Sequence, residues 1–334
     1  MKSRNTIHFI VLSLLIVALF IVDLAVGSVA IPLREVWAAL TGGEVAASTA
    51  KIVCSIRLVK AVVALVAGAA LAVSGLQMQT LFRNPLAGPY VLGISSGASF
   101  GIALLLLGAP LLGIGGSALL SSLGMAGAAW LGAAAILALV AACSRRIKDI
   151  MVILILGMMC SSGIDAVVQI LQYLSSEGAL KSFVIWTMGS LGDVTTLQLG
   201  LLVVAVTAGL ILAIGVIKPL NLLLLGEQYA RTMGLNVRST RLKVFLSTTL
   251  LAGTVTAFCG PVGFIGLAVP HLSRMLFRAA DHRILIPASA LTGSAVLLLC
   301  DILSKLFTLP INTITALMGI PIVVWVVLRH KTIA

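Results

Sequence analysis

The chain has 334 residues, of which 60% are hydrophobic and only 10% are charged. Soluble domains average about 45–50% apolar and about 25% charged residues, so this composition excludes an ordinary water-soluble enzyme or binding domain. The formal net charge of +12 would suggest nucleic acid as the partner of a soluble protein, but here the basic residues flank apolar runs and act first as membrane topology signals.

Ten apolar runs follow one another along the chain, and most reach the about 20 residues that a helix needs to cross a bilayer. The first follows a short basic N-terminus, yet it is longer than a signal-peptide core and lacks a small-x-small cleavage pattern, so we expect a retained span. The sequence therefore predicts an all-α polytopic membrane protein with ten transmembrane helices in a single domain over residues 1–334. The runs occupy residues 7–27, 61–81, 91–107, 117–142, 150–173, 196–217, 242–260, 263–278, 284–304 and 314–328.

The distribution of lysine and arginine predicts the orientation. An even number of spans places both termini on one side, and cytoplasmic loops retain positive charge during insertion. We therefore expect both termini in the cytoplasm. With this orientation, the outer side keeps only six of the 22 basic residues, namely Arg34, Lys51, Arg57, Lys60, Lys181 and Lys305.

The longest connection on the expected inner side covers residues 218–243. Its leucines at 222–225 and its later apolar residues indicate short amphipathic helices that are broken at Gly226 and Gly234. Two interpretations remain open from the residues alone. The segment is either a helix lying at the lipid interface or a docking platform for a cytoplasmic partner.

Polar residues inside the fifth apolar run form a stripe. Asp165, Gln169 and Gln172 are spaced i, i+4 and i+7, which places them on one helical face. An acidic group at membrane depth costs several kcal/mol unless it faces a cavity or a partner. The stripe is therefore either the lining of a transport path or a buried hydrogen-bond cluster between helices.

Catalytic, nucleotide-binding and metal sites are not indicated. Residues 93–97 satisfy GxSxG, but the motif opens an apolar helix without the preceding strand that a hydrolase needs. A GxxxxGK[ST] phosphate loop is absent, and the five cysteines are scattered without metal-ligand spacing. His271 is expected to be a hydrogen-bonded structural residue. The glycines at 93, 97 and 101 are spaced four apart, which is typical of tightly packed membrane helices.

Six motifs spread over nearly the whole chain carry a family resemblance. Residues 57–60 read RLVK, 83–101 read RNPLAGPYVLGISSGASFG, 186–193 read WTMGSLGD, 226–237 read GEQYARTMGLNV, 260–272 read GPVGFIGLAVPHL before DHR at 281–283, and 309–321 read LPINTITALMGIP. These segments resemble the FecCD family of permeases, the membrane subunits of ABC importers for iron-siderophores, haem and cobalamin. The resemblance implies the type II ABC importer permease fold, a homodimer with the transport path on its twofold axis, and no enzyme activity in this chain.

The resemblance also implies roles for individual residues. The loop at Asn84, Pro85 and Leu86 is similar to the family's inner gate, and Asp165, Gln169 and Gln172 would be polar lining of the route. Three basic residues would receive acidic residues of a periplasmic or lipid-anchored binding protein: Arg57, Lys60 and Lys305. The coupling site, which would rest on a cytoplasmic ATPase, is expected at Gly226, Glu227, Tyr229, Ala230, Arg231 and Gly234.

The resulting hypothesis is a permease in the bacterial cytoplasmic membrane that imports an iron chelate, with two partner subunits hydrolysing ATP. No cofactor is expected in the chain itself, and neither a metal site nor a nucleic-acid partner is expected. One alternative is a cobalamin importer of the same family. Another is an ion-coupled secondary transporter with Asp165 as its coupling site, and a third, an intramembrane enzyme, would need paired catalytic groups that Ser95 and His271 do not offer.

Overall fold

The computed structural model describes residues 2–27, 29–111, 122–144, 147 and 149–330, and within these residues every regular element is a helix. In chain order the elements are α1 (Lys2–Ala25), α2 (Leu33–Thr41), α3 (Ala47–Lys51), the π-helical η1 (Ile52–Arg57), α4 (Leu58–Leu81), the 3-10 helix η2 (Pro89–Leu92), α5 (Ile94–Ala103), η3 (Leu104–Gly108), α6 (Ala109–Leu111), α7 (Ser122–Ser144), α8 (Ile150–Leu174), α9 (Glu177–Thr187), α10 (Thr196–Gly215), α11 (Ile217–Leu224), α12 (Glu227–Thr232), α13 (Val237–Thr248), η4 (Thr249–Gly253), α14 (Thr254–Cys259), α15 (Ile265–Phe277), α16 (His282–Phe307) and α17 (Ile311–His330).

Among the described residues, eight helices are long and apolar enough to cross a membrane. Two shorter apolar helices, Ile265–Phe277 and Ile311–Val326, coincide with two further expected runs. At about 1.5 Å per residue the first of these rises only about 20 Å, short of the hydrocarbon thickness. The all-helical, multi-span fold is confirmed, and the count of ten spans stays a prediction. Parts of the expected pattern lie outside the described residues: the start of the run 117–142, Arg145, Arg146, Lys148 and Lys331.

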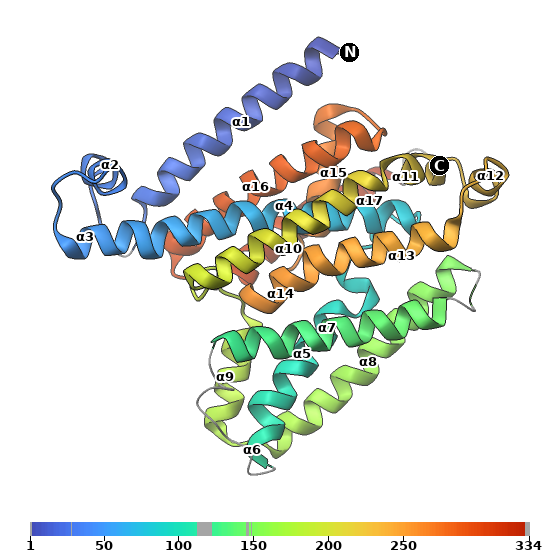
Figure 1. Cartoon of the computed structure of the whole chain (residues 1–334), viewed down its shortest axis with the longest axis horizontal. Helices are drawn as coiled ribbons and strands as arrows, with labels where there is room; N and C mark the ends of the chain where they lie inside the picture. The colour runs from blue at the N-terminus through green and yellow to red at the C-terminus, as the bar shows by residue number, and fades with distance from the viewer. Residues whose placement is uncertain (1, 28, 112–121, 145–146, 148, 331–334) are drawn as a thin grey trace.

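Helix α4 is the centre of the larger group of helices, and 18 of its 24 residues are buried. It packs against α16, α15, α10 and α13 (Figure 1). Two glycines allow backbones to meet directly: a Cβ on Gly68 would overlap the carbonyl of Gly293 in α16, and one on Gly75 would overlap the carbonyl of Gly266 in α15. Small residues at such crossings are the usual means of close packing between membrane helices.

Helices α5, α7, α8 and α9 form a second group beside the first (Figure 1). A Cβ on Gly97 would lie 2.6 Å from the carbonyl oxygen of Gly132 in α7, and one on Gly101 would overlap the carbonyl of Ala128. The close packing expected for these two glycines is confirmed. Gly93 differs, because it has a left-handed backbone with φ of 80° and forms the turn that starts α5.

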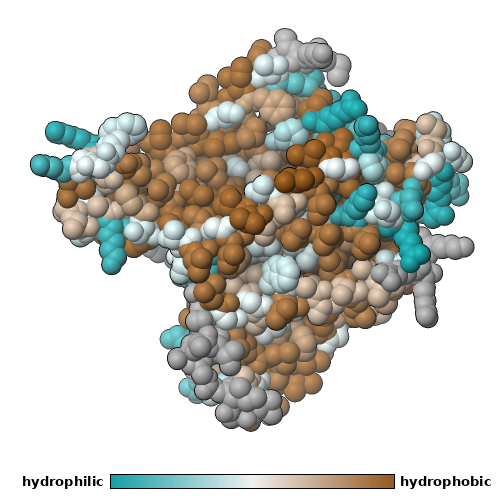
Figure 2. All heavy atoms as spheres, in the orientation of Figure 1, coloured by the Kyte–Doolittle hydropathy of each residue, from teal (hydrophilic) through white to brown (hydrophobic). Residues whose placement is uncertain are grey.

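The surface separates into an apolar belt and two hydrophilic ends. Figure 2 shows apolar side chains over the middle of this face and hydrophilic ones gathered at the two ends of the long helices. Large exposed side chains of the belt include Leu14, Val204 and Ile211. A belt of this kind matches the environment of a bilayer, since lipid replaces water around the spans.

Three helices at one end of the molecule were not expected from hydropathy. The span that ends at Leu81 begins at Ala47, well before the expected start at 61, because α3 and η1 run directly into α4. Together with α2 they project from the end where α1 finishes (Figure 1). Arg57 therefore lies inside a continuous helix, ten residues after its first residue, and not at the start of the span.

Candidate functional site

The segment between α10 and α13 contains the short helices that the sequence predicts. Helices α11 and α12 are separated by Gly226, which has φ of 106°, and α12 ends before Gly234, which has φ of 81°. Only glycine adopts such angles without strain. Because α13 already begins at Val237, the connection is shorter than the expected 218–243.

Helix α12 is fixed on one face and open on the other. Ala230 is fully buried, and the Glu227 carboxylate accepts from Arg231 at 2.5 Å and from Arg241 of α13 at 2.8 Å. The opposite side presents Tyr229 and Met233, which are 49% and 59% exposed. Glu227 therefore orients α12 against α13, and the exposed side is available to a partner.

The loop between α4 and η2 carries the expected gate residues Asn84, Pro85 and Leu86. Asn84 Oδ1 accepts from the backbone N–H of Leu86 at 2.9 Å, which makes a tight turn. His271 Nε2 lies 2.8 Å from the carbonyl oxygen of Pro85, so this ring nitrogen donates and ties the loop to α15. Leu86 itself is exposed. His271 is a hydrogen-bonded structural residue, as expected.

Beside this loop, α4 and α15 are joined through one buried side chain. Gln79 Oε1 accepts from Arg274 Nη1 at 2.6 Å, and Gln79 Nε2 donates to the carbonyl of Leu267 at 3.0 Å. Gln79 Nε2 also lies 3.4 Å from His271 Nε2, but that histidine nitrogen already donates to Pro85. Both nitrogens are therefore donors, and they do not hydrogen-bond each other. Gln79 therefore locks the end of α4 onto α15.

At the opposite end of the molecule, the three basic residues expected to dock a partner are engaged within the chain. Arg57 is 5% exposed and donates to the carbonyls of Leu24 and Ala25 at 2.9 and 2.8 Å. Lys305 binds the carboxylates of Asp23 in α1 and Asp301 in α16, each at 2.8 Å. Both cations are thus used to hold helices together.

Lys60 differs from the other two basic residues in its exposure. It binds Asp301 at 3.0 Å, and its side chain remains 21% exposed, against 9% for Lys305. The two carboxylates of this cluster, Asp23 and Asp301, are completely buried. Three cations against two carboxylates leave an excess of one positive charge at this end of the spans.

The polar stripe of α8 faces away from the core of the chain. Asp165 and Gln169 are exposed and Gln172 is half-buried, and they share this face with apolar residues such as Met158, seven residues before Asp165. The alternative of a hydrogen-bond cluster buried within this chain does not fit these exposures. The stripe is instead open to a neighbouring molecule or to an aqueous path.

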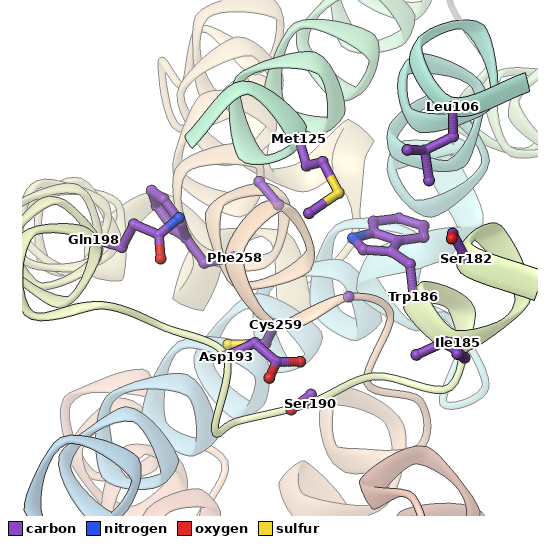
Figure 3. A pocket seen from close by; sticks show the side chains of 12 residues that line it. Leu106, Met125, Ser182, Ile185, Trp186, Ser190, Asp193, Gln198, Phe258 and Cys259 are labelled. Carbon is purple, nitrogen blue, oxygen red and sulfur yellow. The ribbon is translucent and has the colours of Figure 1, made fainter. Parts of the chain in front are cut away.

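A cavity of about 440 Å³ lies where α9 and the start of α10 meet α7 and α14 (Figure 3). Its walls are mixed: Trp186, Met125 and Phe258 supply apolar surface, and Asp193 and Gln198 supply polar groups. Gln198 Oε1 accepts from the backbone N–H of Thr195 at 2.8 Å in the capping box that begins α10. The cavity is thus bounded by two of the segments that carry the family resemblance, 186–193 and 260–272.

Comparison with known proteins settles the family. A model of the FecCD transport family matches residues 14–329. The chain belongs to this family. It is 36% identical over 339 residues to the hemin transport system permease protein HmuU of Yersinia pestis, covering 99% of this chain and 97% of the relative. It is 35% identical over 332 residues to the vitamin B12 import system permease protein BtuC of Salmonella typhi, covering 98% and 97%.

Solved structures agree with the family assignment. An inward-facing metal-chelate type ABC transporter shares 32% identity with this FecCD permease and superimposes with a TM-score of 0.82, covering 98% of this chain and 99% of the other. PsaBC from Streptococcus pneumoniae, at 17% identity and a TM-score of 0.54 over 80% and 88%, shares the fold. The fold is that of a type II ABC importer permease, and the chain is a transport subunit and not an enzyme.

Sequence reasoning missed two groups of buried polar contacts. The carboxylates Asp23 and Asp301 were not connected with Lys60 and Lys305, although Asp301 stands four residues before Lys305 and so faces it on one helix. Arg274 was counted only as a topology signal. Its partner Gln79 is far away in the sequence, so no local pattern indicates the pair.

Proposed function

We propose that this FecCD permease imports an iron chelate, either haem or an iron–siderophore complex. The observation that carries the proposal is the 36% identity to a hemin permease over 99% of the chain, together with the 0.82 TM-score to a metal-chelate type transporter. Cobalamin is the second candidate, because the vitamin B12 permeases are equally similar. Both substrates are large metal complexes, so one wide path suits either.

We propose a homodimer with the path between the two copies. The α8 stripe supports this arrangement, because Asp165 lies about nine residues, or roughly 14 Å, from the nearer end of its helix and would otherwise face lipid. Covering it with a second copy or an aqueous route removes a cost of several kcal/mol. Asp165, Gln169 and Gln172 would then line the route.

The energy source is proposed to be a pair of cytoplasmic ATPase subunits. The exposed side of α12, with Tyr229 and Met233, would rest on the ATPase, and Gly226 and Gly234 would allow the sharp turns on either side of it. Arg231 would face the partner as well, since its side chain is 52% exposed even while it binds Glu227. ATP would be bound and hydrolysed only by the partner.

The loop at Asn84, Pro85 and Leu86 is proposed as the inner gate. It is tied to α15 by the bond from His271 to the carbonyl of Pro85 and to α4 by the bond from the N–H of Asn84 to the carbonyl of Gln79, and Leu86 remains exposed. A loop fixed by few contacts can move with modest loss of free energy. Such a loop is suited to open and close a path.

On the outer side, a substrate-binding protein is proposed to dock at Arg57, Lys60 and Lys305. The excess positive charge of this cluster would attract its acidic residues. Because Lys305 already binds Asp23 and Asp301, docking would require Lys305 to release one of these carboxylates and bind one of the binding protein instead. Lys60, the most exposed of the three, would be the first to make contact.

The membrane is proposed to be the bacterial cytoplasmic membrane, with both termini in the cytoplasm. The positive-inside tendency supports this orientation, since Arg83, Arg274, Arg278 and the basic residues of 218–243 fall on the side that carries α12. A secondary transporter powered by an ion gradient is the rival mechanism, with Asp165 as its coupling residue.

The proposed function is tested by uptake into proteoliposomes that contain the permease, its cognate ATPase subunit and the cognate binding protein. Labelled haemin, a labelled iron–siderophore complex and labelled cyanocobalamin serve as the three probes. ATP-dependent accumulation of haemin or of the iron–siderophore complex, and not of cyanocobalamin, is expected. Accumulation of cyanocobalamin alone would instead identify a cobalamin importer. Accumulation driven by a proton or sodium gradient without ATP would favour the secondary transporter.

A further inference from the structure

Two parts of the chain are named here for the roles proposed above: α11 and α12 are the coupling segment, and Asn84, Pro85 and Leu86 are the gate loop. Three polar side chains connect the coupling segment with the gate loop through the interior of the protein. We propose that Asn221, His282 and Thr80 are positioning residues that transmit a displacement of α11 and α12 to the loop at Asn84, Pro85 and Leu86. This inference rests on the proposed function, because it takes α12 as the contact with the ATPase and that loop as the gate.

The first step joins α11 to the start of α16. Asn221 Oδ1 accepts from the backbone N–H of His282 at 2.9 Å and lies 2.7 Å from His282 Nδ1. Asn221 Nδ2 donates to Asp281 Oδ1 at 2.6 Å. One side chain of the coupling segment therefore holds the first turn of α16 by three bonds, and α11 cannot shift without pulling on His282.

The second step joins His282 to α4, and its hydrogen atoms can be assigned from the partners. The backbone N–H of His282 fixes Asn221 Oδ1 as an acceptor, so His282 Nδ1 must carry a hydrogen to bond the same oxygen. In the neutral ring His282 Nε2 is then an acceptor. It lies 2.8 Å from Thr80 Oγ1, whose hydroxyl supplies the hydrogen.

The Thr80 hydroxyl has one hydrogen and two acceptors within reach. Besides His282 Nε2, the carbonyl of Leu76 one turn earlier in α4 lies 3.0 Å away. While His282 is in place, the hydroxyl bonds the ring of another helix. If His282 withdraws, the hydroxyl can bond its own helix instead. Both residues are nearly completely buried, so no water replaces the lost partner at low cost.

The third step leads from Thr80 into the gate loop itself. The carbonyl of Thr80 accepts from the backbone N–H of Arg83 at 3.2 Å, and the carbonyl of Gln79 accepts from the N–H of Asn84 at 3.2 Å. The last turn of α4 thus forms the base of the loop. The same turn is locked to α15 through Gln79 and Arg274, and α15 holds Pro85 through His271.

The resulting chain of bonds runs through α11, α16, α4 and the loop, and each link joins two different elements. A shift of the coupling segment would change the bonding of Thr80, four residues before Asn84. The Arg83 side chain also comes near Gly226 directly, since a Cβ on Gly226 would lie 3.9 Å from Arg83 Nη1. The buried chain of bonds differs from that surface approach, because it can be interrupted by removing one hydroxyl.

The test measures how much substrate is moved for each ATP hydrolysed. Thr80→Val removes the hydroxyl and keeps the shape, and Thr80→Ser restores the hydroxyl. The matched control is Thr240→Val in α13, because the equally buried Thr240 hydroxyl bonds the carbonyl of Asn236 one turn earlier in the sequence. The complete transporter is reconstituted in proteoliposomes with labelled haemin, a labelled iron–siderophore complex and labelled cyanocobalamin as probes.

Thr80→Val is expected to lower the transport-to-hydrolysis ratio by at least about 5-fold, the lower limit of a typical coupling between sites, while ATP hydrolysis continues. Thr80→Ser should recover most of the ratio and Thr240→Val should leave it unchanged. Asn221→Ala, at a half-buried position, should lower the ratio in the same way, and it decides the question if Thr80→Val does not assemble.

An unchanged ratio in Asn221→Ala, or in an assembled Thr80→Val, would overturn the inference. So would a fall in transport and hydrolysis by the same factor, which indicates only a structural defect. The wild-type transporter separates this failure from failure of the proposed function. If wild type shows no ATP-driven uptake of any of the three probes, the proposed function fails. If wild type transports one of them and the variants keep its ratio, only the transmission route fails.

Discussion

Removal of the Asp301 carboxylate should destabilise the end of the permease that carries Lys60 and Lys305 more than any surface substitution. The side chain is completely buried and binds Lys60 Nζ at 3.0 Å and Lys305 Nζ at 2.8 Å. Breaking a buried pair by removing one partner typically costs about 3–5 kcal/mol, because the remaining charge is left without compensation. Lys305 keeps Asp23 and Lys60 can reach water, so we expect the lower end, about 3 kcal/mol, for Asp301→Asn.

The free energy of unfolding is measured by titrating mixed detergent micelles with a denaturing detergent. The double variant Asp301→Asn/Lys60→Met should recover part of the loss, because it also removes the charge that Asp301→Asn leaves unpaired. Glu44→Gln, at an exposed position, is the control and should stay within about 0.5 kcal/mol of wild type. If Asp301→Asn changes the free energy of unfolding as little as Glu44→Gln does, the interpretation that the cluster holds α4 and α16 together is refuted.

Three further predictions concern other parts of the molecule. Gly97→Val should lower stability in detergent by about 1–3 kcal/mol or more, because even its Cβ would lie 2.6 Å from the Gly132 carbonyl oxygen, and a thermal scan should show the fall. Glu227→Gln should leave the amount of inserted protein unchanged and reduce uptake per ATP, since α12 loses its ion pair to Arg241; an unchanged ratio in proteoliposomes would contradict this. Asp281→Ala should cost about 1 kcal/mol through loss of the cap of α16, seen as a lower unfolding temperature at pH 7. The backbone N–H of Arg283 and the amide of Asn221 lower the pKa of Asp281 from its ordinary value of 3.8. The stability that the Asp281 carboxylate contributes should therefore be fully present above pH 3.8 and disappear as the pH falls through the lowered pKa. A difference in unfolding temperature between wild type and Asp281→Ala that persists below that pKa would contradict this.

Much of the membrane fold is predictable because hydropathy along the chain directly records which segments meet lipid. The short helices around α12 are also predictable, since Gly226 and Gly234 stand where the backbone must take positive φ. The close approach of α5 and α7 follows from the spacing of Gly97 and Gly101. In each case the signal is local, so a single stretch of sequence contains it.

Contacts between distant segments are different. Lys305 and Asp23 are separated by 282 positions, and nothing in either neighbourhood indicates the other. A basic residue near the end of a span can equally well face a partner, the lipid headgroups or a buried carboxylate. The long helix that begins at Ala47 is hidden for another reason, because its first turns mix polar and apolar residues and resemble a loop on a hydropathy scale.

The polar residues of α8 show which features the sequence predicts and which depend on the assembly. The sequence places Asp165, Gln169 and Gln172 on one face, and the structure adds that this face is turned outward from its own chain. What covers the face is a property of the assembly and not of one chain. Its proposed position along the transport path therefore depends on the proposed dimer.

The central claim is that this chain moves its substrate only when a separate ATP-hydrolysing subunit acts on it through α12. The most direct measurement compares accumulation of labelled haemin, a labelled iron–siderophore complex and labelled cyanocobalamin by proteoliposomes that contain the permease and binding protein, with and without the ATPase subunit. The account predicts uptake of one of these probes only when the ATPase subunit and ATP are both present. Uptake of any probe by the permease without that subunit, driven by a proton or sodium gradient, would contradict it.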